Sequence, residues 1–329
     1  MFKSRWYFLG ILFAALIITG CEKEKEEVNE AEVLVKYLES TNSPLMKDYV
    51  NTDLPSIISA TDLNSANLTG QAYIIDIRSA ADFAKGHIAN AVNVTLGDLL
   101  DHVESVNLSS YSKVAVVCYT GQTSGYATAL LRLIGHDNVF SLKWGMSSWH
   151  DTFASPWKSA TASGNLYATQ FTSTVTEKGP KGELPVLSTG FENGQDILEA
   201  RVEALLKEGY DPAKITNQTV FQSPESYYIV NYWPAAQYTD PGHIPGAIQY
   251  TPKETLKLDV DLKTLPTDKP IVVYCYTGQT SSFIAAYLRL LGYDAKSLLF
   301  GANGMIYDIM VSKNMTTFKE SEVMGYNFD

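Results

Sequence analysis

Short apolar runs bounded by turn residues alternate along the chain with stretches of helical periodicity. The runs that predict strands cover residues 74–77, 92–94, 114–117 and 139–142, and then residues 228–230, 247–250, 271–274 and 295–299. Strands that alternate with helices are typical of an α/β domain with a mainly parallel sheet. The pattern therefore predicts an α/β protein of two tandem domains, each a mainly parallel sheet flanked by helices.

A helix pattern follows the third predicted strand of each half. Apolar residues recur there at i, i+3, i+4 and i+7, namely Ala127, Leu130, Leu131 and Ile134 in the first half and Ile284, Tyr287, Leu288 and Leu291 in the second. This spacing predicts two helices with one buried face each, which stop at Gly135 and Gly292. Two further amphipathic patterns predict helices over residues 27–39 and 196–207, which open the first and the second domain.

The two halves of the chain repeat each other. The seven residues from Cys118 to Ser124 recur unchanged from Cys275 to Ser281. Flanking segments match in the same order and spacing, residues 86–91 with 242–247 and residues 130–135 with 287–292. A repeat of this length indicates a duplicated domain and not a short-period solenoid.

Length and composition agree with two domains. A chain of 329 residues is long enough for two domains that each bury a core, and we expect them at residues 21–152 and 193–329. Between them, residues 153–192 are rich in Ser, Thr, Gly and Pro and show little periodicity. They predict a long connector that packs partly against the domains. The net charge of −11 at pH 7 makes a nucleic acid an unfavourable partner.

The remaining patterns give no reason to expect a metal or a cofactor. His102, His136 and His150 lack the spacing of metal ligands. The chain has neither a Walker-type nor a dinucleotide-type glycine pattern. We therefore expect chemistry that rests on side chains alone.

The first residues have the layout of a signal peptide. Lys3 and Arg5 precede an apolar run over residues 6–18, which is shorter than the roughly 20 residues of a spanning helix. Residues 18–21 (Ile-Thr-Gly-Cys) resemble the lipobox of bacterial lipoproteins. The resemblance implies cleavage of residues 1–20 and lipidation of Cys21. A plain secretory signal and a short anchor helix are the alternatives.

If the leader is removed in this way, the protein is exported and held at a membrane by its N-terminal lipid. Glu22 follows Cys21, and by resemblance this residue favours the outer membrane of a Gram-negative host. We therefore expect an exported, lipid-anchored protein on the periplasmic side or at the cell surface.

Both internal cysteines follow a predicted buried strand and precede a short glycine-containing loop and a helix. Backbone N–H groups converge at such a helix start, and with the helix dipole they favour a thiolate or an anionic persulfide. Gly121 and Gly278 allow the backbone to curl around the sulfur. A buried, inert cysteine or one disulfide between the two is the alternative. Two unchanged loops favour two working thiols, Cys118 and Cys275.

Two copies of Gly-His-Ile, each followed by a cysteine loop in an α/β unit, resemble the rhodanese superfamily over roughly residues 55–150 and 210–310. The family pattern C-x-x-G-x-[RT] is matched at residues 118–123 and 275–280. The resemblance implies a sulfurtransferase with Cys118 and Cys275 as catalytic residues. It implies a substrate- and persulfide-binding loop of Tyr119, Thr120, Gly121, Gln122, Thr123 and Ser124 in the first copy, and of Tyr276, Thr277, Gly278, Gln279, Thr280 and Ser281 in the second.

Other residues of the family pattern are expected to be structural. Asp76 and Arg78 resemble the family's D-x-R and imply an ion pair or capping network, which the second copy replaces by Asn231 and Trp233. The Gly-His-Ile histidines, His87 and His243, could act as general bases. Their motif normally forms a turn, and we expect a satisfied turn.

The two loops also depart from the family. Tandem thiosulfate enzymes carry Arg-Lys directly after the cysteine, whereas this chain has Tyr-Thr in both copies. No cation in the loop therefore awaits the sulfonate end of thiosulfate. The tandem enzymes also keep the cysteine only in their second domain, whereas both copies here retain it.

Three functions compete. The first is an enzyme that moves sulfane sulfur through cysteine persulfides from a small donor to a thiol or similar acceptor. The second is a non-catalytic carrier of sulfur or selenium species at the cell surface. The third, a phosphatase, requires C-x5-R, but Ser124 and Ser281 occupy the arginine position, so phosphate would lack its bidentate clamp.

Overall fold

The computed structural model describes residues 29–162 and 164–329. The expected leader, Cys21 and the first two residues of the helix predicted over 27–39 lie outside these described residues. In the part of the chain that is described, no helix combines the length and the apolarity needed to cross a membrane.

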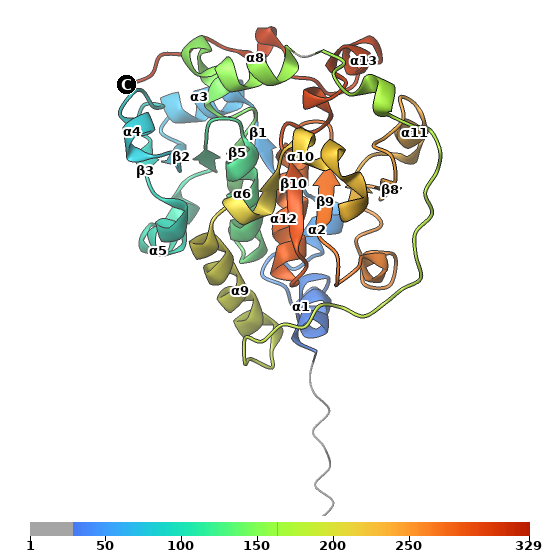
Figure 1. Cartoon of the computed structure of the whole chain (residues 1–329). Helices are drawn as coiled ribbons and strands as arrows, with labels where there is room; N and C mark the ends of the chain where they lie inside the picture. The colour runs from blue at the N-terminus through green and yellow to red at the C-terminus, as the bar shows by residue number, and fades with distance from the viewer. Residues whose placement is uncertain (1–28, 163) are drawn as a thin grey trace, which may run out of the picture.

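The described chain forms two five-stranded parallel sheets (Figure 1). The first contains β1 (Ile57–Ile58), β2 (Ala72–Asp76), β3 (Val92–Asn93), β4 (Lys113–Val117) and β5 (Val139–Leu142) in the order β1-β5-β4-β2-β3. The second contains β6 (Lys214–Ile215), β7 (Tyr228–Asn231), β8 (Ile248–Gln249), β9 (Ile271–Tyr274) and β10 (Ala295–Leu298) in the order β6-β10-β9-β7-β8. The predicted fold class is thus confirmed. The eight predicted strands are present, and the sequence missed only the two-residue edge strands β1 and β6.

Helices flank both sheets. The helices that accompany or follow the first sheet are α1 (Glu30–Leu38), α2 (Tyr49–Thr52), α3 (Ala60–Leu68), α4 (Ala80–Phe83), α5 (Leu99–Ser105), α6 (Gln122–Leu133), α7 (Met146–Trp149) and α8 (Ser155–Thr161). With the second sheet they are α9 (Gly194–Glu208), α10 (Asn217–Gln222), α11 (Ala235–Thr239), α12 (Gln279–Leu290) and α13 (Tyr307–Ser312). We call each sheet with its helices the first and the second domain.

Helices α6 and α12 pack against each other in the centre of the molecule (Figure 1). Nearly every residue of both helices is buried. The contact is close at Gly125, where a Cβ would lie 3.1 Å from the carbonyl oxygen of Gln279. The prediction of one buried face for each helix was therefore wrong. Apolar periodicity identifies the face that covers the helix's own sheet, but the opposite face is covered by the other domain.

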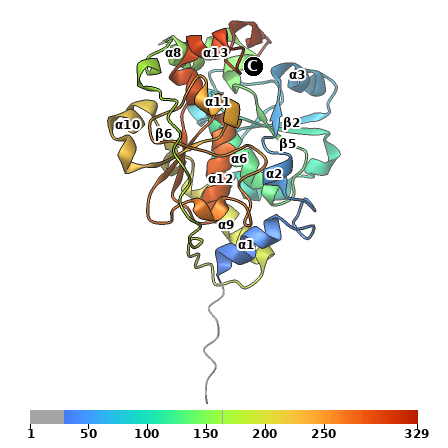
Figure 2. The ribbon, with the colours of Figure 1, turned by 90° about the vertical axis from the view of Figure 1, so that its right-hand side faces the viewer.

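The two leading helices also lie between the domains. Helix α1 is capped by Asn29, whose side chain accepts a hydrogen bond from Glu32 N, and α9 is capped in the same way by Asn193. They pack against each other at one end of the molecule (Figures 1 and 2).

Each leading helix reaches the other domain. The residue after α1, Glu39, accepts a hydrogen bond from Leu258 N of the second domain at 2.8 Å. Helix α9 contacts α5 and α6 of the first domain. The prediction that these helices open their own domains holds along the chain, but in space each bridges to its neighbour.

The segment that follows each domain also pairs with the other domain. Thr172, in the connector, forms two antiparallel backbone hydrogen bonds with His243 of the second domain, both 2.9 Å. Asp329, at the C-terminus, forms the same pair with His87 of the first domain, again at 2.9 Å. The connector packs in part, since Trp157 is fully buried and Leu184 nearly so. The connector after the first domain therefore pairs with the second domain, and the segment after the second domain pairs with the first.

Candidate active site

Cys118 lies between the end of β4 and the start of α6. Its Sγ accepts hydrogen bonds from Gly121 N at 3.2 Å and from Ser124 N at 3.4 Å, and Ser124 Oγ lies 3.4 Å away. Gly121 has a φ of +84°, a left-handed conformation that lets the chain turn around the sulfur into α6. The sulfur therefore occupies the positive end of the α6 dipole, where negative charge is stabilised.

Cys275 occupies the equivalent position between β9 and α12. Its Sγ accepts a hydrogen bond from Ser281 N at 3.3 Å, with Ser281 Oγ at 3.5 Å and Thr277 Oγ1 at 3.9 Å. The serine contacts are common to both loops, but the third contact is the Gly121 amide in one and the Thr277 hydroxyl in the other. The identical loops therefore share the serine contacts to sulfur but differ in the third contact.

Both sulfurs are enclosed. Cys118 is 5% exposed and Cys275 2%, and both are free thiols, as the repeat led us to expect. The other loop residues differ in burial. Gly121, Gln122, Gly278 and Gln279 are buried, whereas Thr123 and Thr280, at the helix starts, are half-buried. The carbonyl oxygen of Thr120 accepts a hydrogen bond from Trp157 Nε1 at 3.1 Å, which fixes this part of the loop.

A tyrosine follows each cysteine, and in the first domain it is held by charged groups. The Arg78 guanidinium carbon lies 5.0 Å from the centre of the Tyr119 ring. The Tyr119 hydroxyl bonds to the carboxylate of Asp82. Hydrogen bonds from Lys85, Ser79 and Tyr119 lower the pKa of Asp82 to about 2. The wall of this site is therefore ionic at neutral pH.

The second domain holds its tyrosine with neutral groups. Tyr276 stacks on Trp233 with 5.4 Å between the ring centres, and its hydroxyl donates to Gln237. Burial raises the pKa of Tyr276 to about 12, so it stays protonated. Trp233 takes the place of Arg78 in the repeat. The two sites therefore share their loops but differ in the charge of their walls.

The expected ion pair and the expected turn contacts of the two histidines are present. Arg78 and Asp76 form a buried ion pair at 2.6 Å. His87 Nδ1 lies 3.0 Å from the carbonyl oxygen of Phe83, and His243 Nδ1 lies 2.7 Å from that of Tyr238. In the second copy Asn231 Nδ2 donates to the Tyr274 hydroxyl at 2.7 Å, a neutral replacement for the ion pair.

Sequence reasoning missed the groups behind each loop. Ser141 on β5 lies 2.8 Å from Ser124 through their hydroxyl oxygens, and Ser297 on β10 lies 2.8 Å from Ser281 in the same way. Gln279 reaches from its own loop into the first domain, where its Nε2 donates to Ser141 Oγ at 2.8 Å. The only sequence signal is one serine in each strand after the helix, a common residue without a motif.

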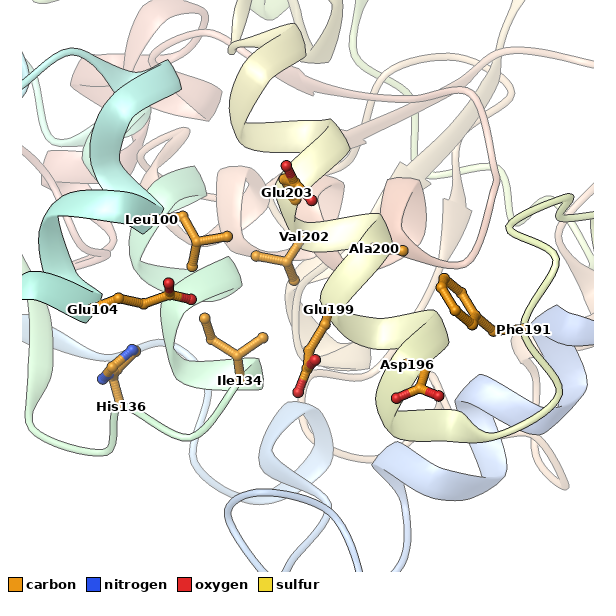
Figure 3. Close-up of a pocket in the computed structure, with 10 residues that line it drawn as sticks. All are labelled: Leu100, Glu104, Ile134, His136, Phe191, Asp196, Glu199, Ala200, Val202 and Glu203. Carbon is orange, nitrogen blue, oxygen red and sulfur yellow. The ribbon is translucent and has the colours of Figure 1, made fainter.

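A cavity of 570 Å³ lies elsewhere, between α5, the end of α6 and α9 (Figure 3). Acidic side chains from α5 and α9, among them Glu104 and Glu199, surround it, and His136 stands at its edge. Burial lowers the pKa of His136, which keeps the imidazole neutral near pH 7. Neither cysteine loop lines this cavity.

Comparison with known proteins places both domains in one family. A model of the rhodanese-like domain matches residues 59–152 and 222–305, which together make up more than half of the chain. A thiosulfate sulfurtransferase, GlpE of Pseudomonas fluorescens, is 34% identical over 82 residues, 25% of this chain and 73% of that protein. GlpE of Shewanella oneidensis is 29% identical over 109 residues, 33% of this chain and the whole of that protein.

Solved structures match as well. A rhodanese-related protein from Thermoplasma volcanium is 26% identical and covers 29% of this chain and 90% of its own, with a TM-score of 0.26. The 3-mercaptopyruvate sulfurtransferase SseA from Escherichia coli is 18% identical and covers 74% of this chain and 97% of its own, with a TM-score of 0.28. With the two family matches and the two parallel sheets, the chain belongs to the rhodanese-like domain family and carries that domain twice.

Proposed function

We propose that this protein is a sulfurtransferase that carries sulfane sulfur as persulfides on Cys118 and Cys275. Membership of the rhodanese-like family and the sulfurtransferase relatives support a sulfurtransferase-type function. The observation that carries the proposal is the position of the two sulfurs. Each Sγ lies at the start of a helix and accepts a hydrogen bond from a serine amide, 3.4 Å from Ser124 N and 3.3 Å from Ser281 N.

Charge balance explains why the same N–H groups can stabilise the sulfur through both steps of the transfer. The cysteine thiolate attacks the outer sulfur of the donor, and a new S–S bond forms while the donor's bond to that sulfur breaks. The leaving group departs with the electron pair, as sulfite from thiosulfate or as a thiolate from a persulfide. An acceptor thiolate then takes the terminal sulfur and restores the cysteine thiolate. Because the thiolate and the persulfide both carry one negative charge, the same N–H groups stabilise both.

A non-catalytic carrier of sulfur or selenium is the second candidate, and the absence of Arg and Lys from both cysteine loops favours it. Turnover separates the two. With a small donor and an excess of acceptor thiol, an enzyme releases many equivalents of product for each protein molecule, whereas a carrier loads once and stops. Continued product formation that Cys118→Ala/Cys275→Ala abolishes supports the enzyme. A single equivalent would support the carrier.

The proposed setting is outside the cytoplasm. The lipobox-like sequence before Cys21 supports export and attachment to a membrane through an N-terminal lipid. The acidic net charge of −11 does not favour nucleic acid as a partner. The partners that fit the loops are a small sulfur or selenium donor and a thiol acceptor.

A further inference from the structure

A row of hydrogen bonds runs from Cys118 into the second domain. Cys118 Sγ lies 3.4 Å from Ser124 Oγ, which lies 2.8 Å from Ser141 Oγ. Ser141 Oγ in turn accepts a hydrogen bond from Gln279 Nε2 at 2.8 Å. The amide of Gln279 also donates to the Leu142 carbonyl oxygen at 3.1 Å, and the side chain is only 1% exposed. The last member of the row therefore belongs to the loop of the other cysteine.

The direction of the row follows from the donors each group has. Gln279 Nε2 can only donate, and the Ser141 hydroxyl has one proton. That proton points to Ser124 Oγ or to the Gly121 carbonyl oxygen, which lies 3.1 Å away. When it points to Ser124, the proton of Ser124 is free to point to the sulfur. Every bond from Gln279 to the sulfur then has the same sense, and each polarises the next.

The equivalent row behind Cys275 ends differently. Ser297 Oγ lies 2.8 Å from Ser281 Oγ and 3.2 Å from Ser282 Oγ, whose single proton points to Ser297 or to the Gly278 carbonyl oxygen at 2.7 Å. Ser282 lies 2.7 Å from the hydroxyl of Tyr210, which follows α9. Burial raises the pKa of Tyr210, so it remains a donor. This row therefore stays within the second domain.

One residue beyond the repeated heptapeptide accounts for the difference. Ser282 has Gly125 as its counterpart in the first copy, so the first loop has no hydroxyl to place behind Ser141. The missing side chain also lets the start of α12 approach, since a Cβ on Gly125 would lie 3.1 Å from the Gln279 carbonyl oxygen. Gln122, the counterpart of Gln279, sends its Nε2 to Thr120 Oγ1 of its own loop at 3.1 Å. Gln122 also crosses between the domains, since its Oε1 accepts a hydrogen bond from Phe300 N at 2.7 Å. That contact is to the backbone and not to a serine behind Cys275, so the support of the serine row is not reciprocal.

We infer that Gln279 is a positioning residue for Cys118, so that the second domain completes the sulfur site of the first. Cys275 is supported within its own domain by Tyr210. The inference rests on the proposed function, because it concerns the anionic sulfur of the same two sites. The hydrogen-bond row behind Cys118 therefore ends on a residue of the second domain, whereas the row behind Cys275 ends on Tyr210 of its own domain.

The test is the rate of persulfide formation at each cysteine separately, measured by peptide mass spectrometry on the full chain over a range of polysulfide concentrations. In Gln279→Leu the maximal rate at Cys118 falls roughly fivefold, the effect of losing one hydrogen bond between neutral groups. The half-saturating polysulfide concentration at Cys118 stays unchanged, because the Gln279 side chain reaches Cys118 only through Ser141 and Ser124. The loss at Cys118 exceeds any loss at Cys275, in whose own loop Gln279 lies.

Two further variants probe the rows themselves. Ser141→Ala removes the middle of the first row, so it reproduces the defect at Cys118, and adding Gln279→Leu to it causes no further loss. This arm also serves if Gln279→Leu does not fold. Tyr210→Phe slows Cys275 more than Cys118.

Asn51→Ala is the matched control. It removes another buried amide that crosses between the domains, from Asn51 Nδ2 to the Leu256 carbonyl oxygen at 3.1 Å, and it leaves both rates unchanged. Equal slowing of both cysteines in Gln279→Leu, or an unchanged Cys118, overturns the inference. If neither cysteine loads in the unmodified protein, the proposed function fails instead.

Discussion

At the scale of single residues, the two sites share the serine that contacts each sulfur and differ in the residues that hold the tyrosine after each cysteine. Ser124 and Ser281 each present a backbone N–H and a hydroxyl to the cysteine. These serines stand where a phosphatase of this fold needs arginine, so the loop favours a single anionic sulfur over a phosphate. The walls differ, with Arg78 in the first domain and Trp233 in the second.

The charge of the cysteine loops predicts which sulfur donor the protein prefers. Thiosulfate is a dianion, the loops contain no Arg or Lys, and the chain is acidic. We expect polysulfide to load the protein several-fold faster than thiosulfate at equal concentration. The double variant Tyr276→Arg/Thr277→Lys should then raise the rate with thiosulfate at Cys275 and leave Cys118 unchanged. Site-resolved mass spectrometry measures both rates.

The opposite outcome is informative about one residue. If thiosulfate loads Cys118 faster than polysulfide does in the unmodified protein, the prediction is wrong. The cation that serves it would then be Arg78, whose guanidinium lies beside Tyr119 although it is paired with Asp76.

At the scale of the elements, the sequence predicted what depends on one domain and missed what depends on two. The inner strands carry their own apolar signal, so β4 and β9 were located within one residue. The two-residue strands β1 and β6 were missed because neither lies in an apolar run as long as those that located β3 and β8. The burial of α6 and α12 on both faces follows from contact between domains, which periodicity along one helix does not record.

The candidate site shows the same division. The position of the cysteine and the glycine turn could be predicted, because a strand, a short loop and a helix are contiguous in sequence. The role of Gln279 could not, since its partner Ser141 lies 138 residues away. The third donor at each sulfur likewise depends on small differences in packing around identical loops.

The bridge from α1 to the second domain predicts a pH dependence of stability. Burial raises the pKa of Glu39 from its ordinary 4.5 to about 7, despite the hydrogen bond from Leu258 N. The folded protein therefore binds a proton more tightly than the unfolded chain. The stability linked to Glu39 is full below about pH 4.5 and is lost as the pH rises to about 7.

Glu39→Gln should remove this loss, because a neutral amide oxygen still accepts the hydrogen bond from Leu258 N. We expect the variant to be more stable at pH 8 by up to about 1 kcal/mol, a value reduced for partial exposure to solvent. At pH 4.5 the two proteins should be equally stable. Urea unfolding at both pH values measures the difference, and a variant less stable at pH 8 would contradict the account.

At the scale of the whole molecule, the exchanged segments make the two domains one unit. One hydrophobic cluster includes Leu130 of α6, Leu198 of α9 and Leu288 of α12. The backbone pairs of Thr172 with His243 and of Asp329 with His87 tie the segment after each domain to the other domain. The two domains therefore share a hydrophobic core and are not independent units joined by a free linker.

This arrangement predicts a single unfolding transition for the full chain. Circular dichroism reports both sheets, and fluorescence reports the buried tryptophans, three of which, Trp144, Trp149 and Trp157, belong to the first domain and the segment after it. We expect the two signals to change at the same urea concentration. Two separate midpoints would mean that the domains unfold independently.

The N-terminal cysteine carries the prediction about location. Wild-type protein expressed in a Gram-negative host should partition with membranes and label with a radioactive fatty acid. Cys21→Ala should lose the label and leave the membrane fraction or remain unprocessed. Attachment that persists without Cys21, together with an uncut leader in the wild type, would rule out the lipoprotein reading.

The most direct test of the central claim is the intact mass of the soluble chain from residue 22 onwards after exposure to polysulfide, compared among the wild type, Cys118→Ala, Cys275→Ala and the double variant. The account predicts up to two added sulfur atoms in the wild type, one in each single variant and none in the double variant. All additions should disappear on treatment with an acceptor thiol. If one single replacement removes all loading, the other cysteine does not form a persulfide, and the account of two sulfur sites is wrong.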